Sequence, residues 1–323
     1  MENSSVQQID DSLNITSSTG RSFWIDRSFN ILVHSFALIT VNILLWMIAV
    51  VYREAKPAID KFGLDFIWSQ DWDTLEGLYG ALPYVYGTLV SSGLAILIAI
   101  PVGLAVALVT SEDFLPDWVK SPIAFIVELI AAIPSVIIGL WAIYVLIPFL
   151  IPLQEWLYNN LSWIPLFDTE DTSGNNMMTA AIVLAIMILP TMAAISRDVL
   201  LVIPKQLRTG AMALGSTRWE TIFRVLLPAG FSGIVGATML ALGRALGETM
   251  AVTMVIGNFN QIKPSLLEAA YTIPAVLANE FAEAENSLHV GALTYLALIL
   301  FALTLVVNIG AVILVQVLDR NKK

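Results

Sequence analysis

Six long runs of apolar residues are separated by polar segments along this chain. A helix rises about 1.5 Å per residue, so about 20 residues cross the hydrocarbon core of a bilayer. Each run is long enough to do so and is predicted to be one helix; the runs lie at about 31–52, 84–109, 121–151, 178–196, 230–256 and 290–316. Pro101 and Pro134 fall inside two runs and predict kinks, because a proline removes a helical hydrogen bond. Such prolines are tolerated in a bundle, where neighbouring helices can bind the freed carbonyl groups. The pattern therefore predicts an all-α polytopic membrane protein with six transmembrane helices.

The polar segments on either side of the first run differ in composition. Residues 1–20 have few apolar positions and no helical period, so we predict a disordered tail, which we extend to residue 29. The first run follows Arg21 and Arg27 and lacks a small-residue cleavage site, as expected of an uncleaved anchor. Segment 53–80 mixes charges with aromatic residues typical of a membrane interface, and we predict that it lies along the membrane surface. Residues 30–323 are then expected to form one membrane domain.

The distribution of lysine and arginine predicts the orientation of the chain. The side that holds both termini and the loops 110–120 and 197–229 carries eleven of the 16 Lys and Arg residues, and the opposite side carries four. Positive residues are enriched in cytoplasmic loops. We therefore predict a multi-pass membrane protein, in contact with lipid, with both termini in the cytoplasm. The remaining basic residue, Arg244, lies inside the fifth run.

Composition excludes several classes of function. Hydrophobic residues make up 57% of the chain and charged residues 13%, which leaves too little polar surface for a soluble globule. The net charge of −10 argues against a nucleic-acid partner. The chain has no cysteine, and its two histidines, His34 and His289, are too far apart to suggest a metal site, so we expect a structural or incidental role for them. No Gly-x-x-x-x-Gly-Lys-Ser/Thr motif is present, so we predict that the chain binds no cofactor and hydrolyses no ATP itself.

Charged residues inside the apolar runs need an explanation. A charge at the centre of a bilayer helix costs about 2.5–3.5 kcal/mol on insertion scales. Arg244 and Glu248 are four residues apart, which places them on one face of a helix, one turn apart, where they can pair. Glu128 lies about a third of the way into the third run, where a structural hydrogen bond explains it better than a role in transport.

Small residues share the helical face of Arg244 and Glu248. At about 100° per residue, the members of this face are Gly233, Ala237, Ala241 and Ala251. Such a face can line a narrow polar passage, in which the arginine presents a planar fork of donors to an oxyanion. The same spacing, with Gly243-x-x-x-Gly247, is also typical of close helix packing, in which the two charges form an internal ion pair. The residues leave both interpretations open, and the fork of donors favours the passage.

The loop 197–229 has an internal structure of its own. Ile203-Pro204 ends one element, residues 205–214 predict a short helix, and Gly215 breaks it. Residues 216–226 predict a second amphipathic helix that ends at Leu227-Pro228. Two short helices at a bend can insert into the groove of another protein, or they can form a connector that lies on the membrane surface. Spacing alone does not decide between these.

Several motifs resemble those of ABC importer permeases. Residues 207–228, LRTGAMALGSTRWETIFRVLLP, are similar to the family's coupling loop, whose pattern is Glu-Ala-Ala, a glycine four residues on and a later Leu-Pro. Residues 242–252, LGRALGETMAV, resemble the phosphate-specific permeases of the PstC type, and so do AIPSVIIGL at 132–140 and VLANEF at 276–281. The resemblance implies a type I ABC importer permease fold with a core at about 80–317, located in the bacterial inner membrane.

The resemblance also implies partners and residue roles. It implies a PstA-type permease subunit, two copies of a cytoplasmic ATPase that binds ATP-Mg, and an extracytoplasmic phosphate-binding protein. Arg244 and Glu248 are the residues that it links to phosphate passage. It assigns to the ATPase-coupling loop Arg208, Thr209, Gly210, Ala211, Gly215, Leu227 and Pro228. Thr209 and Gly210 replace the usual glutamate and first alanine, which puts in doubt an ion pair from that position to the ATPase.

We therefore predict a permease subunit that imports inorganic phosphate with ATP hydrolysed on a partner. One alternative is a permease for another oxyanion, such as sulfate or molybdate. A second is an intramembrane enzyme acting on a lipid phosphate, with Arg244 holding the phosphate and Glu248 as acid or base.

Overall fold

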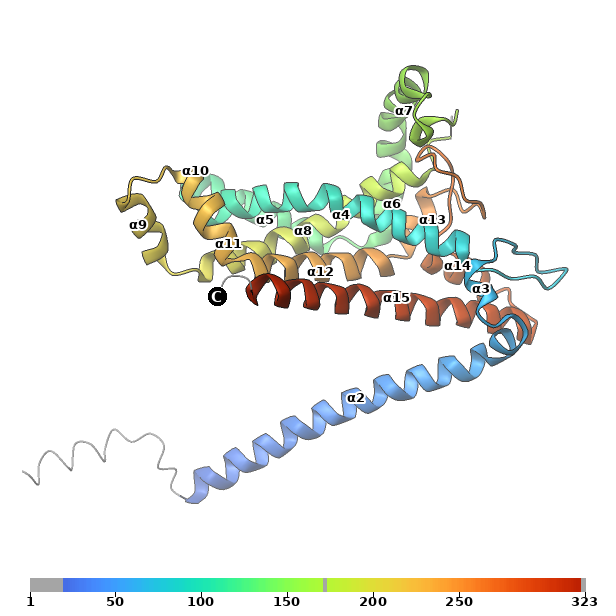
Figure 1. Cartoon of the computed structure of the whole chain (residues 1–323), viewed down its shortest axis with the longest axis horizontal. Helices are drawn as coiled ribbons and strands as arrows, with labels where there is room; N and C mark the ends of the chain where they lie inside the picture. The colour runs from blue at the N-terminus through green and yellow to red at the C-terminus, as the bar shows by residue number, and fades with distance from the viewer. Residues whose placement is uncertain (1–19, 171–172, 321–323) are drawn as a thin grey trace, which may run out of the picture. The chain divides into compact units, whose positions relative to one another are not determined.

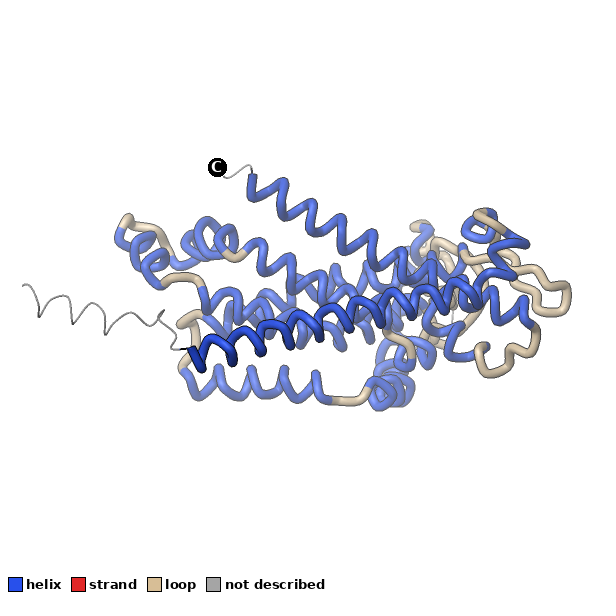
Figure 2. Tube along the Cα trace, turned by 90° about the horizontal axis from the view of Figure 1, so that it is seen from below, coloured by secondary structure: helices blue, strands red, loops and turns tan. Residues whose placement is uncertain are grey.

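A computed structural model describes residues 20–170 and 173–320. The chain divides into two compact units, residues 1–53 and 54–323. Helix α2 (Gly20–Phe62) crosses this boundary, and the described residues otherwise form helices and loops (Figure 2). The predicted disorder of residues 1–19 lies outside the described residues. For residues 20–29 the prediction is wrong, because they belong to α2, and α2 also continues through residues 53–62, which we expected to be a surface segment.

The larger unit continues with helices of very different length. The first group is α3 (Asp65–Trp68), α4 (Leu82–Ser111), α5 (Asp117–Ala132), α6 (Ser135–Trp141), the π-helical segment η1 (Ala142–Leu146), α7 (Ile147–Leu161) and the 3₁₀ turn η2 (Pro165–Phe167). The second group is α8 (Met177–Val202), α9 (Lys205–Ala213), α10 (Arg218–Thr221), the π-helical segment η3 (Ile222–Leu226), α11 (Leu227–Ala229), α12 (Phe231–Gly247), α13 (Met250–Val255), α14 (Ile273–Glu280) and α15 (Ser287–Arg320).

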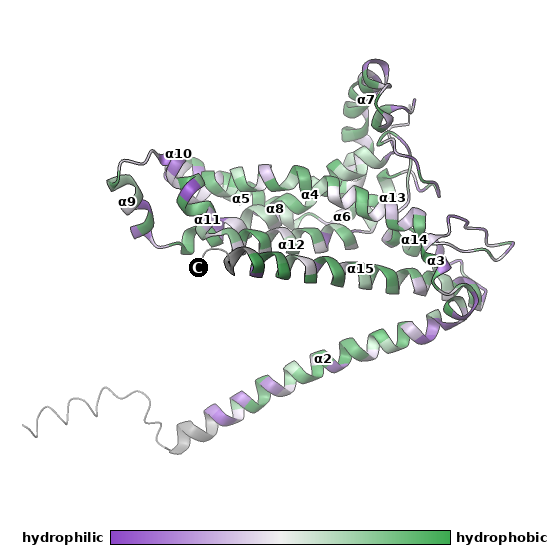
Figure 3. Ribbon diagram, viewed as in Figure 1, coloured by the Kyte–Doolittle hydropathy of each residue, from purple (hydrophilic) through white to green (hydrophobic). Residues whose placement is uncertain are grey.

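The long helices α4, α8, α12 and α15 run side by side (Figure 1). Helices α9–α11 lie at one end of this bundle, and α3, α13 and α14 lie at the other. Apolar residues dominate the middle of the bundle helices, and the polar residues collect toward the two ends (Figure 3). This distribution suits a bundle whose middle lies in the bilayer.

Helices α4 and α8 form the centre of the core. Ala95 and Ala99 of α4 are fully buried, and a Cβ atom at Gly103 would lie 2.7 Å from Cγ of Met192 on α8. Small residues on one helix let the backbone of the other approach closely, which is how helices pack in lipid. The tight α4–α8 contact therefore fixes the relative position of the elements at both ends of the bundle.

The six-span prediction is confirmed with two changes. Among the described residues, five helices are long and apolar enough to cross a membrane, and the pair Arg218–Ala229 and Phe231–Gly247, bent by 71°, makes up to six. The prediction of one continuous helix over 121–151 is wrong, because α5 ends at Ala132 and Ile133 is extended. A proline disfavours the helical conformation of the residue before it, here Ile133. Pro134 then occupies the N-cap position of α6. Beyond this break the chain turns, and α7 runs across the direction of the bundle (Figure 1).

The fifth run is also discontinuous. Helix α12 ends at Gly247, Glu248 has an extended backbone with φ −68° and ψ 125°, and α13 begins at Met250. Oε1 of Glu248 accepts a weak hydrogen bond of 3.4 Å from the amide of Ala251. The predicted continuous helix over 230–256 is therefore wrong, and a charged residue occupies the break.

The end of the bundle that holds α14 is closed by a polar and aromatic cluster. Glu280 Oε2 accepts from Trp72 Nε1 at 2.9 Å and lies 3.2 Å from Nε2 of buried His289. The ring of Tyr79 stacks on His289 with centroids 5.5 Å apart. These contacts tie the segment after α2 to the start of α15, so part of segment 53–80 is folded into the bundle. They confirm a structural role for His289.

Candidate transport path and coupling elbow

Arg244 lies in the last turn of α12, and its side chain is exposed. Its Nη1 donates one hydrogen bond of 3.3 Å to Thr191 Oγ1 on α8. A guanidinium group carries five N–H donors, and within the described residues no other acceptor binds this one. Arg244 therefore presents unused donors beside α8, in the geometry that can bind two oxygens of an anion.

Glu248 does not pair with Arg244. Within the described residues the two side chains form no ion pair, although they are four residues apart. The physical reason is the end of α12 at Gly247, because pairing at this spacing requires a continuous helical turn. The ion pair that the packing interpretation implied is therefore absent, and Glu248 lies in the break before α13 and is half-buried.

The small-residue face of α12 is a packing face. Ala237 and Ala241 are fully buried in the core, and a Cβ atom at Gly233 would lie 2.5 Å from the side chain of Val199 on α8. Ala251, which we placed on the same face, lies beyond the break in α13 and is also fully buried. We kept both interpretations of this face but favoured a passage over packing, and the structure instead packs it against the chain's own helices. The exposed glycines of α12 are different ones, Gly236, Gly243 and Gly247, and a Cβ atom at each would meet open space.

The predicted bend between two short helices is confirmed. We call residues 205–229 the elbow: α9 ends before Gly215, whose φ is +89°, and α10, η3 and α11 follow. Thr217 and Glu220 form a capping box, in which the Thr217 side chain accepts from the Glu220 amide and Glu220 accepts from the Thr217 amide. The hydrogen bonds that the Thr217 amide and, next in size, the Thr217 hydroxyl donate to the Glu220 carboxylate lower its pKa below the usual value. Leu227 and Pro228 lie at the start of α11, where the chain turns into α12.

The elbow exposes large apolar side chains on its surface. The most exposed of them are Leu214 at 89%, Trp219 at 60% and Phe223 at 60%. Thr209 and Gly210 are exposed as well, and a Cβ atom at Gly210 would meet no atom within 4 Å. The two departures from the family pattern therefore lie on this free surface and leave the shape of α9 intact, and Ala211 beside them is half-buried.

Arg208 points inward from the elbow. Its Nη2 lies 2.8 Å from Oε1 of Glu112, and the two side chains are only 16% and 15% exposed. Arg208 also donates to the carbonyls of Leu200 and Ile203 at the end of α8, at 2.7 and 2.9 Å. Our sequence reasoning placed Arg208 in the loop but missed Glu112. The short acidic turn SEDF at 111–114, opposite a basic loop, was the available signal.

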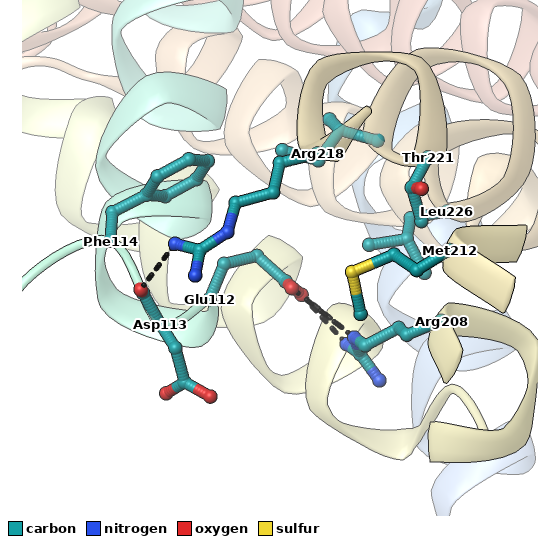
Figure 4. A pocket seen from close by; sticks show the side chains of 9 residues that line it. Glu112, Asp113, Phe114, Arg208, Met212, Arg218, Thr221 and Leu226 are labelled. Carbon is teal, nitrogen blue, oxygen red and sulfur yellow. Dashed lines mark hydrogen bonds and ion pairs between the residues drawn. The ribbon is translucent and has the colours of Figure 1, made fainter. Parts of the chain in front are cut away.

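A hollow of about 140 Å³ lies between the elbow and the turn that joins α4 to α5 (Figure 4). Its lining includes Glu112, Phe114, Arg208, Met212 and Arg218. The carboxylate of Asp113 points away from the hollow and pairs with Lys120 at 3.0 Å, and this bond lowers the pKa of Asp113. Within the described part of the chain, no group of three or more His, Asp or Glu side chains could hold a metal ion.

Glu128 is exposed on α5, and among the described residues it forms no hydrogen bond. It lines a hollow of about 20 Å³, room for one water molecule, together with Thr110 and Arg197. The Nε atom of Arg197 is buried without a hydrogen-bond partner in the described structure. The hydrogen bond that we predicted for Glu128 therefore has no protein partner here.

Comparisons with known proteins identify relatives along nearly the whole chain. Residues 99–323 match the family described as the binding-protein-dependent transport system inner membrane component. The phosphate transport system permease protein PstC of Haemophilus influenzae is 38% identical over 303 residues, covering 93% of this chain and 96% of the relative. The PstC protein of Mesorhizobium japonicum is 41% identical and covers 84% of each chain.

Solved structures of ABC transporters share the fold. A bacterial alginate ABC transporter, in complex with an alginate-bound periplasmic protein, matches with a TM-score of 0.60 over 89% of this chain and 95% of the other. The MetNI methionine ABC transporter, in an inward-facing conformation, matches with a TM-score of 0.53 over 74% of this chain and 94% of the other. Both are 18% identical to this chain, so they show the fold alone.

Proposed function

Because this chain belongs to the inner membrane components of binding-protein-dependent transport systems, we propose that it is the permease subunit of an importer of inorganic phosphate. It is a multi-pass transport subunit, and ATP is hydrolysed on a separate subunit. The observation that carries phosphate as the substrate is the 38–41% identity to phosphate permeases over more than four fifths of the chain. These relatives do not favour sulfate, molybdate or a lipid phosphate as the substrate.

Arg244 is the residue that we assign to phosphate. It is exposed at the end of α12 and has unused donors beside Thr191 of α8. A planar guanidinium group binds two oxygens of a phosphate at once, which a lysine cannot do. One arginine in an open path gives a weak and transient site, and weak binding permits release.

Glu248 is expected to act on the same anion by repulsion. It lies at the break between α12 and α13, one residue beyond the end of the helix that carries Arg244. A carboxylate that forms no ion pair with the arginine raises the local negative potential and weakens the binding of a dianion. Attraction by Arg244 and repulsion by Glu248 together would then set the residence time of phosphate.

The elbow is the part that we assign to the ATPase. Its exposed apolar side chains, Leu214, Trp219 and Phe223, fit a groove on a partner protein. Two copies of the ATPase, a PstA-type permease and a phosphate-binding protein would complete the importer. The excess of Lys and Arg on the elbow side supports a cytoplasmic location for the elbow and both termini.

The Arg244→Gln variant tests the transport role. We expect the purified complex in lipid vesicles to keep its subunits but to lose ATP-dependent phosphate entry by about 100-fold or more, because the bidentate donor is gone. Arg244→Lys is the matched variant, since it keeps the charge but loses the fork, and we expect it to retain part of the uptake. Unchanged uptake in Arg244→Gln would remove Arg244 from the path, and equal competition by sulfate would remove the phosphate assignment.

A further inference from the structure

We propose that Glu112 is a positioning residue, which transmits movement of the elbow into helix α4 during transport. The proposal rests on the proposed function of the elbow as the site where the ATPase docks. Glu112 lies at the C-terminal end of α4, 96 residues before its partner Arg208 in the chain. No covalent connection links α4 directly to the elbow, so any transmission between them has to pass through such contacts.

The Glu112–Arg208 contact is a bidentate ion pair. Both Nε and Nη2 of Arg208 donate to the carboxylate, at 3.1 and 2.8 Å to Oε1. The remaining donors of Arg208 bind the Leu200 and Ile203 carbonyls, which the end of α8 leaves without helical partners. One side chain therefore joins the elbow, the end of α8 and the end of α4. Its low exposure distinguishes the pair from flexible surface ion pairs, which contribute little.

The second helix of the elbow holds the same turn. Arg218 Nη1 donates to the carbonyl of Asp113 at 3.1 Å, and the ring of Trp219 lies 5.4 Å from the ring of Phe114. Both α9, through Arg208, and α10, through Arg218, therefore contact the turn between α4 and α5, on the two sides of the hollow in Figure 4. A movement of the elbow as a body would carry the end of α4 with it.

A series of side-chain contacts connects helix α4 with the Arg244 site. A Cβ atom at Gly103 of α4 would touch Met192 of α8, and Thr238 of α12 donates to Sδ of Met192 at 3.6 Å. Met192 adjoins Thr191, the hydrogen-bond partner of Arg244. Close-packed interiors transmit displacement because they contain few voids. Loosening the elbow end of α4 should therefore affect the movement of phosphate more than the binding of the ATPase.

The Glu112→Gln variant of the complete importer in vesicles tests this role. Glutamine keeps the size of the side chain but removes the charge that holds Arg208. We expect the complex to retain its ATPase subunits and to hydrolyse ATP, while the phosphate moved per ATP falls about tenfold. Glu112→Asp keeps the charge and should restore part of that ratio. The matched control is Lys120→Gln, which breaks the neighbouring Lys120–Asp113 pair and should change the ratio less than about twofold.

Three results would overturn the proposal. These are a wild-type ratio of phosphate to ATP in Glu112→Gln, an equal fall in Lys120→Gln, and loss of the ATPase subunits from both Glu112 variants, which would assign the pair to docking. Arg244→Gln in the same vesicles separates this inference from the proposed function. If Arg244→Gln stops uptake while Glu112→Gln transports normally, only the positioning role fails; if Arg244→Gln transports normally, the transport path itself is misassigned.

Discussion

Arg208 and Arg244 show how surroundings give the same residue type opposite roles. The donors of Arg208 are taken up by one carboxylate and two carbonyls of the chain itself. Arg244 has one acceptor, Thr191, among the described residues. Because a charge in a membrane helix is costly unless it is paired, Arg244 needs an anion or a partner subunit to complete it. At this scale, incomplete hydrogen bonding is the feature that supports a functional role.

Gly87 offers a test of packing at a single residue. A Cβ atom there would overlap the carbonyl oxygen of Tyr271, so we expect Gly87→Ala to destabilise the protein by about 1–3 kcal/mol. Gly93→Ala on the same helix is the matched control, because a Cβ atom at Gly93 meets no atom within 4 Å. Thermal unfolding of the purified complex, followed by circular dichroism, measures both. Equal unfolding temperatures for the two variants would contradict the close contact between α4 and the loop at Tyr271.

Two helices of the bundle, α5 and α12, stop before the neighbouring long helices do. Their continuations α6 and α13 pack on each other, since a Cβ atom at Gly139 would lie 2.6 Å from Sδ of Met254. The breaks place Pro134 and Glu248 at the ends of half-helices. Broken helices in membranes are tolerated where the freed backbone is covered by protein or lines a cavity.

The turn of the elbow at Gly215 gives a prediction for an element. Its φ of +89° is unfavourable for a β-branched residue, so Gly215→Val should strain the elbow by about 1–3 kcal/mol. If the strain falls on the docked shape, binding of the ATPase weakens about five- to 150-fold. Copurification of the ATPase with the permease measures this.

Gly210→Ala is the control for the elbow. It restores the alanine that is usual in the family, at a position with no atom within 4 Å of the new Cβ, and should leave ATPase retention unchanged. Full retention in Gly215→Val would show that the elbow is not the docking element.

At the scale of the whole molecule, the sequence predicts an uneven distribution of charge between the two sides of the membrane. The chain carries a net charge of −10, and our prediction places eleven of its 16 Lys and Arg residues on the side of the elbow. We therefore expect the opposite side to be acidic and to repel free phosphate. This favours delivery of phosphate by a binding protein over direct entry from solution.

Orientation can be measured directly, because the chain contains no cysteine that would react in the background. Leu75 is 96% exposed at the end of the bundle opposite the elbow, and the Asp113 side chain is 99% exposed on the elbow side. We expect a membrane-impermeant maleimide to label Leu75→Cys in intact spheroplasts, and Asp113→Cys only after the membrane is opened. The reverse pattern would invert the proposed orientation.

The amino-acid sequence by itself determined the features that depend on neighbouring residues. The apolar runs predicted the six spans, and Gly215 and Leu227-Pro228 predicted the elbow, because helix period, turn and helix end are local properties. Pro134 predicts a kink in the sequence, and the structure has a full break between α5 and α6 there. The break at Glu248 carried no comparable signal.

Only the tertiary structure decided which surfaces are covered. Ala237 and Ala241 share a face with Arg244 in sequence, yet burial against α8 makes that face part of the core and leaves Arg244 at its edge. Arg208 belonged to the loop in sequence, yet its partner is Glu112, 96 residues away. Burial and distant pairs depend on how helices are brought together, and helical periodicity carries no information about that.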